Sequence, residues 1–281
     1  MILDGKATAR NLEESLKLEV SSLVEKHGRA PKLIVILVGN NPASVSYVKS
    51  KEKACKRVGI DGETLKLEEN VTEQELIDII KRLNVDKGVD GMIVQLPLPK
   101  HINCDKVLNE ISYKKDVDGL SLLNAGKLAN RQKGLQPATP KGVMMLLEHY
   151  KIDVKGMHAV IVGASNLVGA PMAKLLINNY ATVTVCHIHT KDLKYHTLQA
   201  DLLVVATGVK DLITGDMVKE GVIVVDVGIS KIDGHISGDV HFDSVAPKAS
   251  YITPVPGGVG PMTISALIHN VVEAYKEEYY D

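Results

Sequence analysis

A glycine-bearing turn in the second half of the chain has the composition of a phosphate-binding site. The apolar run His158–Val162 is typical of a buried strand, and it leads through Gly163–Pro171 into a helical pattern. Such a turn, placed at a helix N-terminus, offers free backbone N–H groups to a pyrophosphate. It departs from G-x-G-x-x-G, because Ser165 replaces the middle glycine and Gly169 falls one residue late. It predicts a dinucleotide site, with an ordinary strand–helix turn as the alternative.

Further candidate cofactor contacts follow the ends of three later strands. Ligands bind at the carboxyl edge of doubly wound sheets, and small residues occur there at Ala206–Gly208 and Val227–Ile229. The segment Cys186–Lys191 has no acid for the ribose of NAD, while its His, Thr and Lys side chains suit a phosphate. We therefore favour NADP and leave NAD open. No third ligand accompanies the two histidines, so we expect no metal. The predicted contacts are Gly163, Ala164, Ser165, Val168, His187, His189, Thr190, Thr207, Gly208 and Ile229.

A second loop, Pro254–Thr263, is dense in proline and glycine. This composition argues against a helix or a central strand within the loop. An apolar helical pattern begins at Ile264, so we expect the loop to end at a helix N-terminus with Thr263 as its cap. That position favours a ligand-side loop, and a plain turn is the alternative.

Two series of alternating strands and helices position these loops, so the predicted fold class is α/β with two domains. Continuous apolar runs are typical of parallel strands that are buried on both faces. The predicted domains comprise 1–139 plus 262–281 and 140–261, and the polar residues from Tyr275 onward are interpreted as a tail. The expected strands are Leu33–Val38, Glu63–Leu67, Gly91–Val94, His158–Val162, Thr182–Cys186, Leu202–Ala206 and Val222–Val227. The expected helices are 7–27, Ser44–Val58, Glu73–Leu83 capped by Thr72, Lys141–Tyr150, Leu167–Asn178 and one from Thr263.

Composition excludes several classes of function. The 281 residues carry a net charge of −1 without a long basic run, so we expect neither nucleic acid nor an anionic membrane as a partner. No apolar stretch suits a signal peptide or a membrane span. The three cysteines are far apart and form no CxxC pair, which favours free thiols in a reducing cytoplasm.

The chain resembles, along nearly its whole length, the bifunctional methylenetetrahydrofolate dehydrogenase/cyclohydrolase family. The motifs that carry the resemblance are Tyr47–Lys51, Val94–Pro99, Lys115–Gly119, Pro137–Gly142, Gly163–Pro171, Ala206–Gly208, Gly238–Val240 and Pro254–Thr263. The resemblance implies a Rossmann-like, doubly wound NAD(P) domain inserted into a folate-binding domain, with a cleft between them. It also implies a homodimer that acts in purine biosynthesis. The implied reactions are oxidation of 5,10-methylene-tetrahydrofolate to the methenyl cation and hydrolysis of that cation to 10-formyl-tetrahydrofolate.

The resemblance also implies roles for particular residues. Lys51 is the expected general acid/base of the hydrolytic step, because burial beside a cationic substrate would lower its pKa. Gln95 would orient Lys51, and Tyr47, one helical turn earlier, would stack on the folate. Asp118 would accept hydrogen bonds from the pterin edge. Each has a structural alternative: a solvated lysine, a loop amide, a half-buried tyrosine and a turn aspartate.

The remaining expected contacts come from the Pro/Gly loop. Gly257, Gly258 and Pro261 would pack their backbone against the folate, and Thr263 would lie near the nicotinamide. Relatives that use NADP usually carry Arg and Ser where this chain has Ala164 and Ile188, which weakens the expected phosphate grip. A monofunctional dehydrogenase, a non-catalytic nucleotide-binding regulator and a shikimate-dehydrogenase-like enzyme are the alternatives. Lys51, Tyr47 and Gln95 argue against the first, and the presence of Lys51, Gln95 and Asp118 together argues against the second. The Pro254–Thr263 run argues against the third.

Overall fold

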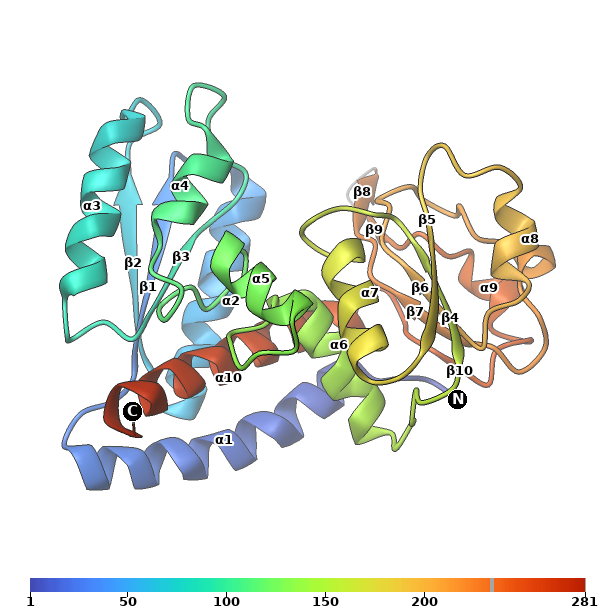
Figure 1. Ribbon diagram of the computed structural model, residues 1–281, viewed down its shortest axis with the longest axis horizontal. Coiled ribbons are helices and arrows are strands. Elements are labelled where there is room, and N and C mark those ends of the chain that lie inside the picture. The colour runs from blue at the N-terminus through green and yellow to red at the C-terminus, as the bar shows by residue number, and fades with distance from the viewer. Residues whose placement is uncertain (233–234, 281) are drawn as a thin grey trace. The chain divides into compact units, whose positions relative to one another are not determined.

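A computed structural model describes residues 1–232 and 235–280, which form two compact units (Figure 1). The three-stranded unit comprises residues 11–138 and those from Ile264 onward. The five-stranded unit comprises Met1–Arg10 and Thr139–Thr263. Boundaries between the units fall within α1 (Gly5–His27), at the first residue of α6 (Ala138–His149) and within α10 (Val259–Tyr280).

The three-stranded unit is a parallel sheet with helices on both faces. Its strand order is β2 (Asp61–Leu67), β1 (Lys32–Val38) and β3 (Gly91–Val94). Successive residues of β1 enter opposite cores, because side chains alternate along a strand. One core contains residues of α1, α2 (Pro42–Val58) and α10, and the other contains residues of α3 (Glu73–Val85) and α4 (Cys104–Glu110). The short helix α5 (Leu122–Ala129) follows α4.

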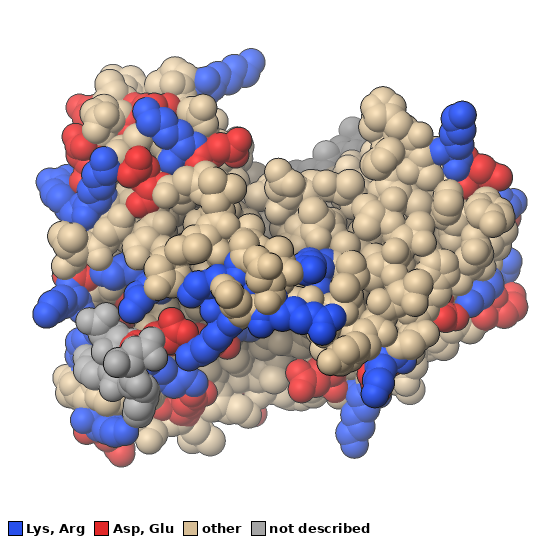
Figure 2. All heavy atoms as spheres, in the orientation of Figure 1, with Lys and Arg blue, Asp and Glu red and all other residues tan. Residues whose placement is uncertain are grey.

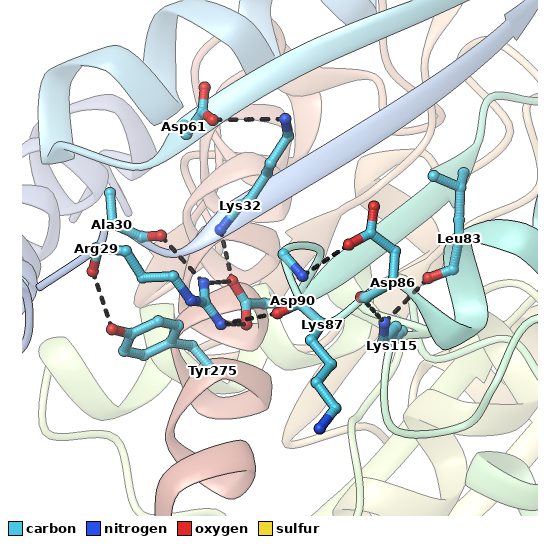
Figure 3. A network of polar contacts seen from close by, with 11 residues as sticks. Arg29, Ala30, Lys32, Asp61, Leu83, Asp86, Lys87, Asp90, Lys115 and Tyr275 are labelled. Atoms are coloured by element: carbon cyan, nitrogen blue, oxygen red, sulfur yellow. Dashed lines mark hydrogen bonds and ion pairs between the residues drawn. The ribbon is translucent and has the colours of Figure 1, made fainter. Parts of the chain in front are cut away.

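Polar contacts fix the amino ends of these strands (Figure 3). The Arg29 guanidinium donates to both carboxylate oxygens of Asp90, over 2.7 and 2.8 Å, and the Lys32 amide donates to the same carboxylate. Tyr275, which is fully buried, donates its hydroxyl hydrogen to the Arg29 carbonyl, so the interpretation of a polar tail from Tyr275 is wrong at that residue. The carboxyl ends of β1 and β3 lie at the other end of the sheet.

The five-stranded unit is a wholly parallel sheet in the order β10-β7-β6-β4-β5. Its strands are β4 (His158–Val162), β5 (Thr182–Cys186), β6 (Leu202–Val205), β7 (Ile223–Asp226) and β10 (Tyr251–Ile252). The hairpin β8 (Ser230–Ile232) and β9 (His235–Ser237) follows β7. The helical elements are α6 (Ala138–His149), α7 (Gly169–Asn178), α8 (Leu193–Thr197), the 3₁₀ turn η1 (Gly215–Met217) and α9 (Phe242–Val245).

The first residues of the chain lie in the five-stranded unit, although the sequence pattern assigns them to the other domain. Ile2 forms a parallel bridge with Ile252, the Leu3 amide donates to the Ile252 carbonyl over 2.8 Å, and the Leu3 side chain is completely buried. Backbone hydrogen bonds to the edge strand β10 thus place these residues in the five-stranded unit, although the residues that follow them in the sequence belong to the other unit. The unit boundaries at Ala138–Thr139 and Thr263–Ile264 lie close to the predicted ones.

The C-terminal helix begins earlier than predicted. It starts at Val259, so Gly260 and Pro261 lie in its first turn, where backbone N–H groups have no partner within the helix and proline is tolerated. Thr263 therefore is not the cap. Its hydroxyl instead lies within hydrogen-bonding distance of the Val259 carbonyl (3.3 Å) and the Thr139 hydroxyl (3.1 Å), both in the same unit.

Charges of both signs are interspersed over the face seen in Figure 2. Surface ion pairs such as Lys106–Glu73 and Lys194–Asp216 accompany this mixture. Among the described residues, no helix is both long and apolar enough to cross a bilayer.

Candidate active site

Lys51 and Gln95 meet at the carboxyl edge of the three-stranded sheet. Asn41 caps α2 by accepting hydrogen bonds from the Ala43 and Ser44 amides, and this helix carries Lys51 to the loop that follows β3. The Lys51 ammonium donates to the Gln95 side-chain carbonyl over 3.0 Å. The Gln95 amide group donates in turn to the Leu96 carbonyl over 2.8 Å. Because an ammonium group can only donate, Gln95 presents its oxygen to the lysine, and the bond to Leu96 fixes the amide in that orientation.

Burial shifts the protonation of both charged groups at this site. Desolvation lowers the pKa of Lys51, and the negative charge of Asp118 opposes that shift. Desolvation likewise raises the pKa of Asp118, where the Lys51 charge acts in the opposite direction and Asp116 adds to the rise. Both shifts favour the neutral forms, as expected when water is excluded from an ionisable pair. Lys51 is thereby prepared to exchange a proton.

The loop that presents Asp118 is held by its neighbours. Buried Asp116 accepts hydrogen bonds from the Ser121 amide (2.8 Å) and from the Asn124 side chain (2.9 Å). Lys115 donates to the Leu83 and Asp86 carbonyls at the end of α3, as Figure 3 shows. Among the described residues, no donor is bonded to the Asp118 carboxylate. The carboxylate is therefore left available for a ligand.

The loop requires glycine at position 119 both for its backbone conformation and for the lack of space around it. Its φ is +70°, and a Cβ there would collide with the backbone at Gln136 and Pro137. A side chain at this position is therefore excluded twice, by conformation and by space. The alternative that Asp118 merely precedes a turn glycine accounts for Gly119 and leaves the unpartnered carboxylate unexplained.

Tyr47 lies one turn before Lys51 on α2 and is 44% exposed. A tyrosine that remains this exposed beside an ionisable pair offers a ring face to a planar ligand. The structure thus brings Lys51, Gln95 and Asp118 into one site and leaves Tyr47 accessible one turn away.

The predicted phosphate turn has the geometry of a close backbone approach. Gly163 follows β4 with φ +112°, and a Cβ there would overlap the Ala206 carbonyl. Gly169 opens α7, and a Cβ there would overlap the Gly163 carbonyl. Val168 occupies the cap position without a side-chain hydrogen bond, while the Ser165 hydroxyl accepts from the Val168 amide over 3.3 Å. The Val168 and Ala170 amides are already donated to Ser165, so a pyrophosphate would be bound by backbone amides of the exposed residues 164–167 that precede α7.

His187, His189 and Thr190 form a tight turn after β5. The Thr190 hydroxyl accepts from the His187 amide (2.8 Å), and His187 Nδ1 accepts from the His189 amide (3.1 Å). Since Nδ1 is an acceptor, the neutral His187 ring carries its proton on Nε2 and can donate from there. Ile188 beside them is 93% exposed. Among the described residues, no group of three His, Cys, Asp or Glu side chains is arranged to hold a metal.

Thr207 and Gly208 follow β6 as predicted, but a residue without an assigned role already binds them. The buried carboxylate of Asp239 accepts from the Thr207 amide (2.6 Å), the Thr207 hydroxyl (2.9 Å) and the Gly208 amide (2.9 Å). Ile229, after β7, is half exposed. The sequence singled out Gly238–Val240 only as one of the motifs of the resemblance and assigned Asp239 no role.

The Pro/Gly loop packs against the start of α1. The Lys6 amide donates to the Gly257 carbonyl over 2.9 Å, and the Gly258 amide donates to the Pro254 carbonyl over 2.9 Å. A Cβ on Gly5 would collide with the Gly258 carbonyl. Packing within the five-stranded unit thus requires the absence of a side chain at Gly5 and Gly258, whereas a Cβ on Gly257 would meet no neighbouring atom. Gly5 was missed by sequence reasoning because a lone glycine near a helix start has no specific pattern.

Two domain models of one sequence family match this chain. The tetrahydrofolate dehydrogenase/cyclohydrolase catalytic domain matches residues 3–118, and the NAD(P)-binding domain of the same family matches residues 137–279. The bifunctional protein FolD of Wolinella succinogenes is 55% identical over 276 residues, which are 98% of this chain and 96% of the relative. The Aquifex aeolicus protein of the same name is 52% identical over 280 residues, which are 99% of this chain and 96% of the relative.

Solved structures agree with these matches. The bifunctional FolD dehydrogenase/cyclohydrolase from Campylobacter jejuni has a TM-score of 0.97 at 53% identity and covers 99% of both chains. The Trypanosoma brucei enzyme, solved with NADP and an inhibitor, has a TM-score of 0.95 at 36% identity and covers 100% of this chain and 99% of its own.

Proposed function

The chain belongs to the tetrahydrofolate dehydrogenase/cyclohydrolase family, and on that premise we propose which of its residues perform the two reactions. It is a bifunctional enzyme that oxidises 5,10-methylene-tetrahydrofolate with NADP and hydrolyses the methenyl product to 10-formyl-tetrahydrofolate. The observation that carries the residue assignment is the Lys51–Gln95 contact of 3.0 Å in a desolvated setting beside Asp118.

The dehydrogenase step needs orientation more than acid–base chemistry. When bound, the nicotinamide accepts a hydride from the one-carbon bridge of the folate. The folate nitrogen lone pairs stabilise the resulting cation, so no protein base has to remove a proton. The turn at Gly163–Gly169 would hold the pyrophosphate, with Ala164, Ser165 and Val168 along it. Fixing donor and acceptor in contact supplies much of the rate enhancement.

The cyclohydrolase step requires proton transfer. Water adds to the methenyl carbon, and a proton must leave that water and reach a ring nitrogen before the C–N bond breaks. Lys51 with its lowered pKa can accept the first proton and return it to nitrogen. The Gln95 oxygen holds one amine hydrogen and so fixes the direction of the lone pair. The negative charge of Asp118 opposes the lowering of the Lys51 pKa, because it stabilises the ammonium form.

Folate recognition would use groups that the protein leaves without partners. The Asp118 carboxylate suits the paired N–H donors of a pterin edge, and Tyr47 offers a ring face. Gly257, Gly258, Pro261 and Thr263 are proposed as backbone and side-chain neighbours of the ligands. Because Gly258 and Thr263 also have packing partners of their own, their contribution would be steric.

NADP is the cofactor, and its 2′-phosphate has a proposed site in the turn after β5. His187, His189, Thr190 and Lys191 lie there without a nearby acid to repel the phosphate before Asp192. The proposed contacts at the strand ends are Thr207, Gly208 and Ile229. Thr207 retains its carbonyl oxygen for such a contact, because its amide and hydroxyl hydrogens are donated to Asp239.

Substrate conversion with isotopic label tests this assignment. Purified protein is mixed with NADP and methylene-tetrahydrofolate that carries deuterium at the one-carbon bridge. We expect deuterium on the reduced nicotinamide and 10-formyl-tetrahydrofolate as the final product. Accumulation of the methenyl compound without its enzymatic hydrolysis would support a monofunctional dehydrogenase instead.

We also propose a homodimer in the cytoplasm that supplies one-carbon units for purine biosynthesis. The outer edge of the seven-residue strand β2 pairs with no described strand, and such edges are templates for pairing with another chain. Cys55, Cys104 and Cys186 are free, which suits a reducing compartment. Sedimentation at several concentrations tests the assembly, and a monomer throughout would contradict it.

A further inference from the structure

Two carboxylates are buried together at the carboxyl ends of β6 and β7. Asp239 is 0% exposed and Asp226 is 3% exposed. Among the described residues, neither carboxylate is paired with a lysine, arginine or histidine. Burying a charge without a counter-charge costs several kcal/mol in free energy. Hydrogen bonds from the surrounding backbone are the compensation that the structure provides.

The hydrogen bonds of this pair join three separate segments. Asp239 Oδ2 accepts the three hydrogen bonds from Thr207 and Gly208. Asp226 Oδ1 accepts from the Gly228 amide (3.1 Å) and the Asp239 amide (3.1 Å), and its Oδ2 accepts from Val240 (2.9 Å). The turns after β6 and β7 are thereby linked to the strand-like segment that contains Asp239.

The other oxygen of Asp239 has no partner. Asp239 Oδ1 is buried and accepts no hydrogen bond, and it lies against Gly228, where a Cβ would overlap the carboxylate. The carboxylate is therefore confined to one position by close contact as well as by hydrogen bonds. Desolvation raises the pKa of Asp226 to about 6, and the Asp239 charge adds to that rise, which indicates how little water reaches the pair.

We propose that Asp239 is a positioning residue for the dinucleotide, acting through the Thr207–Gly208 turn rather than by touching the ligand. This proposal rests on the proposed cofactor site at the same edge. The three hydrogen bonds remove the rotational freedom of that turn before the ligand arrives, and such pre-organisation raises affinity without a new contact. Asp226 supports this arrangement by binding the Asp239 amide.

The test compares Asp239→Ala and Asp239→Asn with Asp243→Ala, which removes an exposed carboxylate from α9 of the same unit. Calorimetry gives the NADP dissociation constant, and amide hydrogen exchange reports on Thr207 and Gly208. For Asp239→Ala we expect faster exchange at both amides and NADP binding weakened by roughly ten- to a hundredfold. Asp239→Asn should show a smaller loss, because its carbonyl still accepts from the backbone. Asp243→Ala should match the wild type.

The cyclohydrolase activity serves as the internal control, since it requires no dinucleotide and its proposed acid/base residues, Lys51 and Gln95, lie in the three-stranded unit. We expect its kcat/KM to be unchanged in Asp239→Asn. Faster exchange at Thr207 and Gly208 with unaltered NADP affinity would overturn the proposal. If Asp239→Ala fails to fold, Asp239→Asn decides the question by the same two measurements. Wild-type protein that binds NADP without turning over folate would contradict the proposed function and leave this test valid.

Discussion

At Lys51, two opposing electrostatic effects determine what the amine can do. Desolvation disfavours the ammonium form, and the Asp118 charge favours it. Desolvation is the larger effect, so the pKa of Lys51 falls below its ordinary value of 10.5. A half-buried lysine held by an amide oxygen thus serves as a base closer to neutral pH than a solvated lysine does.

Replacing Lys51 with methionine should remove the hydrolytic reaction selectively. A general acid/base typically contributes ~10²–10⁴-fold to the rate, and the apolar chain of methionine preserves most of the packing. We expect cyclohydrolase kcat to fall by about that factor while NADP binding persists. Lys53→Met, on an exposed position of the same helix, is the control and should retain full activity. Wild-type hydrolysis by Lys51→Met would refute the assignment.

Asp118→Asn should change both folate affinity and the pH profile. Loss of a charged hydrogen bond costs roughly 1.5–3 kcal/mol, which corresponds to about ten- to a hundredfold weaker binding. The substitution also removes the charge that stabilises protonated Lys51, so the pKa of Lys51 falls further. The rising limb of the cyclohydrolase pH–rate profile should move to lower pH. An unmoved limb with weaker folate binding would show that Asp118 acts on the substrate alone.

Ala164→Arg should strengthen NADP binding. Ala164 is exposed at the start of the phosphate turn, so a guanidinium has room to reach a 2′-phosphate. A charge-assisted bidentate contact is worth roughly 1–3 kcal/mol, or about five- to 150-fold in the dissociation constant. NAD, which lacks that phosphate, is the matched control ligand in the same calorimetric experiment. Equal tightening of both dinucleotides would place the arginine on the pyrophosphate.

At the scale of secondary structure, the ends of β6 and β7 carry a pH-dependent contribution to stability. Burial raises the pKa of Asp226 from its ordinary 3.8 to about 6. The folded state then binds this proton more tightly than the unfolded state does. The stabilisation is complete below pH 3.8 and is lost as the pH rises through about 6, with a difference of roughly 3 kcal/mol.

Asp226→Asn should remove that contribution. The difference in free energy of unfolding between pH 4 and pH 7 should be smaller in the variant by up to about 3 kcal/mol. Thermal unfolding of the five-stranded unit at several pH values provides the measurement. Asp243→Asn, which alters an exposed carboxylate of the same unit, should retain the wild-type slope. If the free energy of unfolding of Asp226→Asn changed with pH as steeply as that of the wild type, another group would be responsible for the pH dependence.

Sequence patterns predicted the buried parallel strands well and the short helices poorly. The strands at β1, β3, β4 and β5 and the capping of α3 by Thr72 are confirmed, because apolar runs and a capping box are local signals. The helices α4 and α5 and the hairpin β8–β9 were not predicted. Helices of seven and eight residues are too short to establish a period, and their ends depend on Asn103 and Ser121.

The candidate site shows the same division between local and non-local information. The turn at Gly163 and the positions at strand ends were predicted, since the topology of a parallel sheet fixes that edge. The Thr207–Asp239 contact and the packing of Gly5 against Gly258 join residues far apart in sequence. One sequence without homologues contains no signal for such pairs. The domain limits and ligand contacts stay predictions.

At the scale of the whole molecule, α10 contributes to both units. Tyr275 lies in its second half, fully buried, with its hydroxyl bonded to Arg29 and the Arg29 guanidinium 4.8 Å from its ring centroid. The core of the three-stranded unit therefore depends on a helix that is separated from its strands in the sequence by residues 139–263, which belong to the five-stranded unit.

Tyr275→Ala should destabilise the three-stranded unit by about 3–5 kcal/mol, as large-to-small changes at buried aromatics do. Cyclohydrolase activity should become more sensitive to heat, while NADP binding by the five-stranded unit is retained. Tyr275→Phe, which removes only the hydroxyl bond, should cost about 1 kcal/mol. Activity loss on heating and calorimetric titration check the two units separately. Simultaneous loss of both functions in Tyr275→Ala would show that the units unfold together.

The discontinuity of both units has a consequence for the chain as the ribosome makes it. Residues 1–10 are made before the edge strand that they join, β10, which follows nearly all of the five-stranded unit in the sequence. Residues 11–138 emerge next and must wait for the helix from Ile264 onward before their apolar face is covered. Domains generally fold as units during synthesis, at about 5–20 residues per second. Nascent chains of this protein should therefore carry exposed apolar surface for several seconds before the two units are complete.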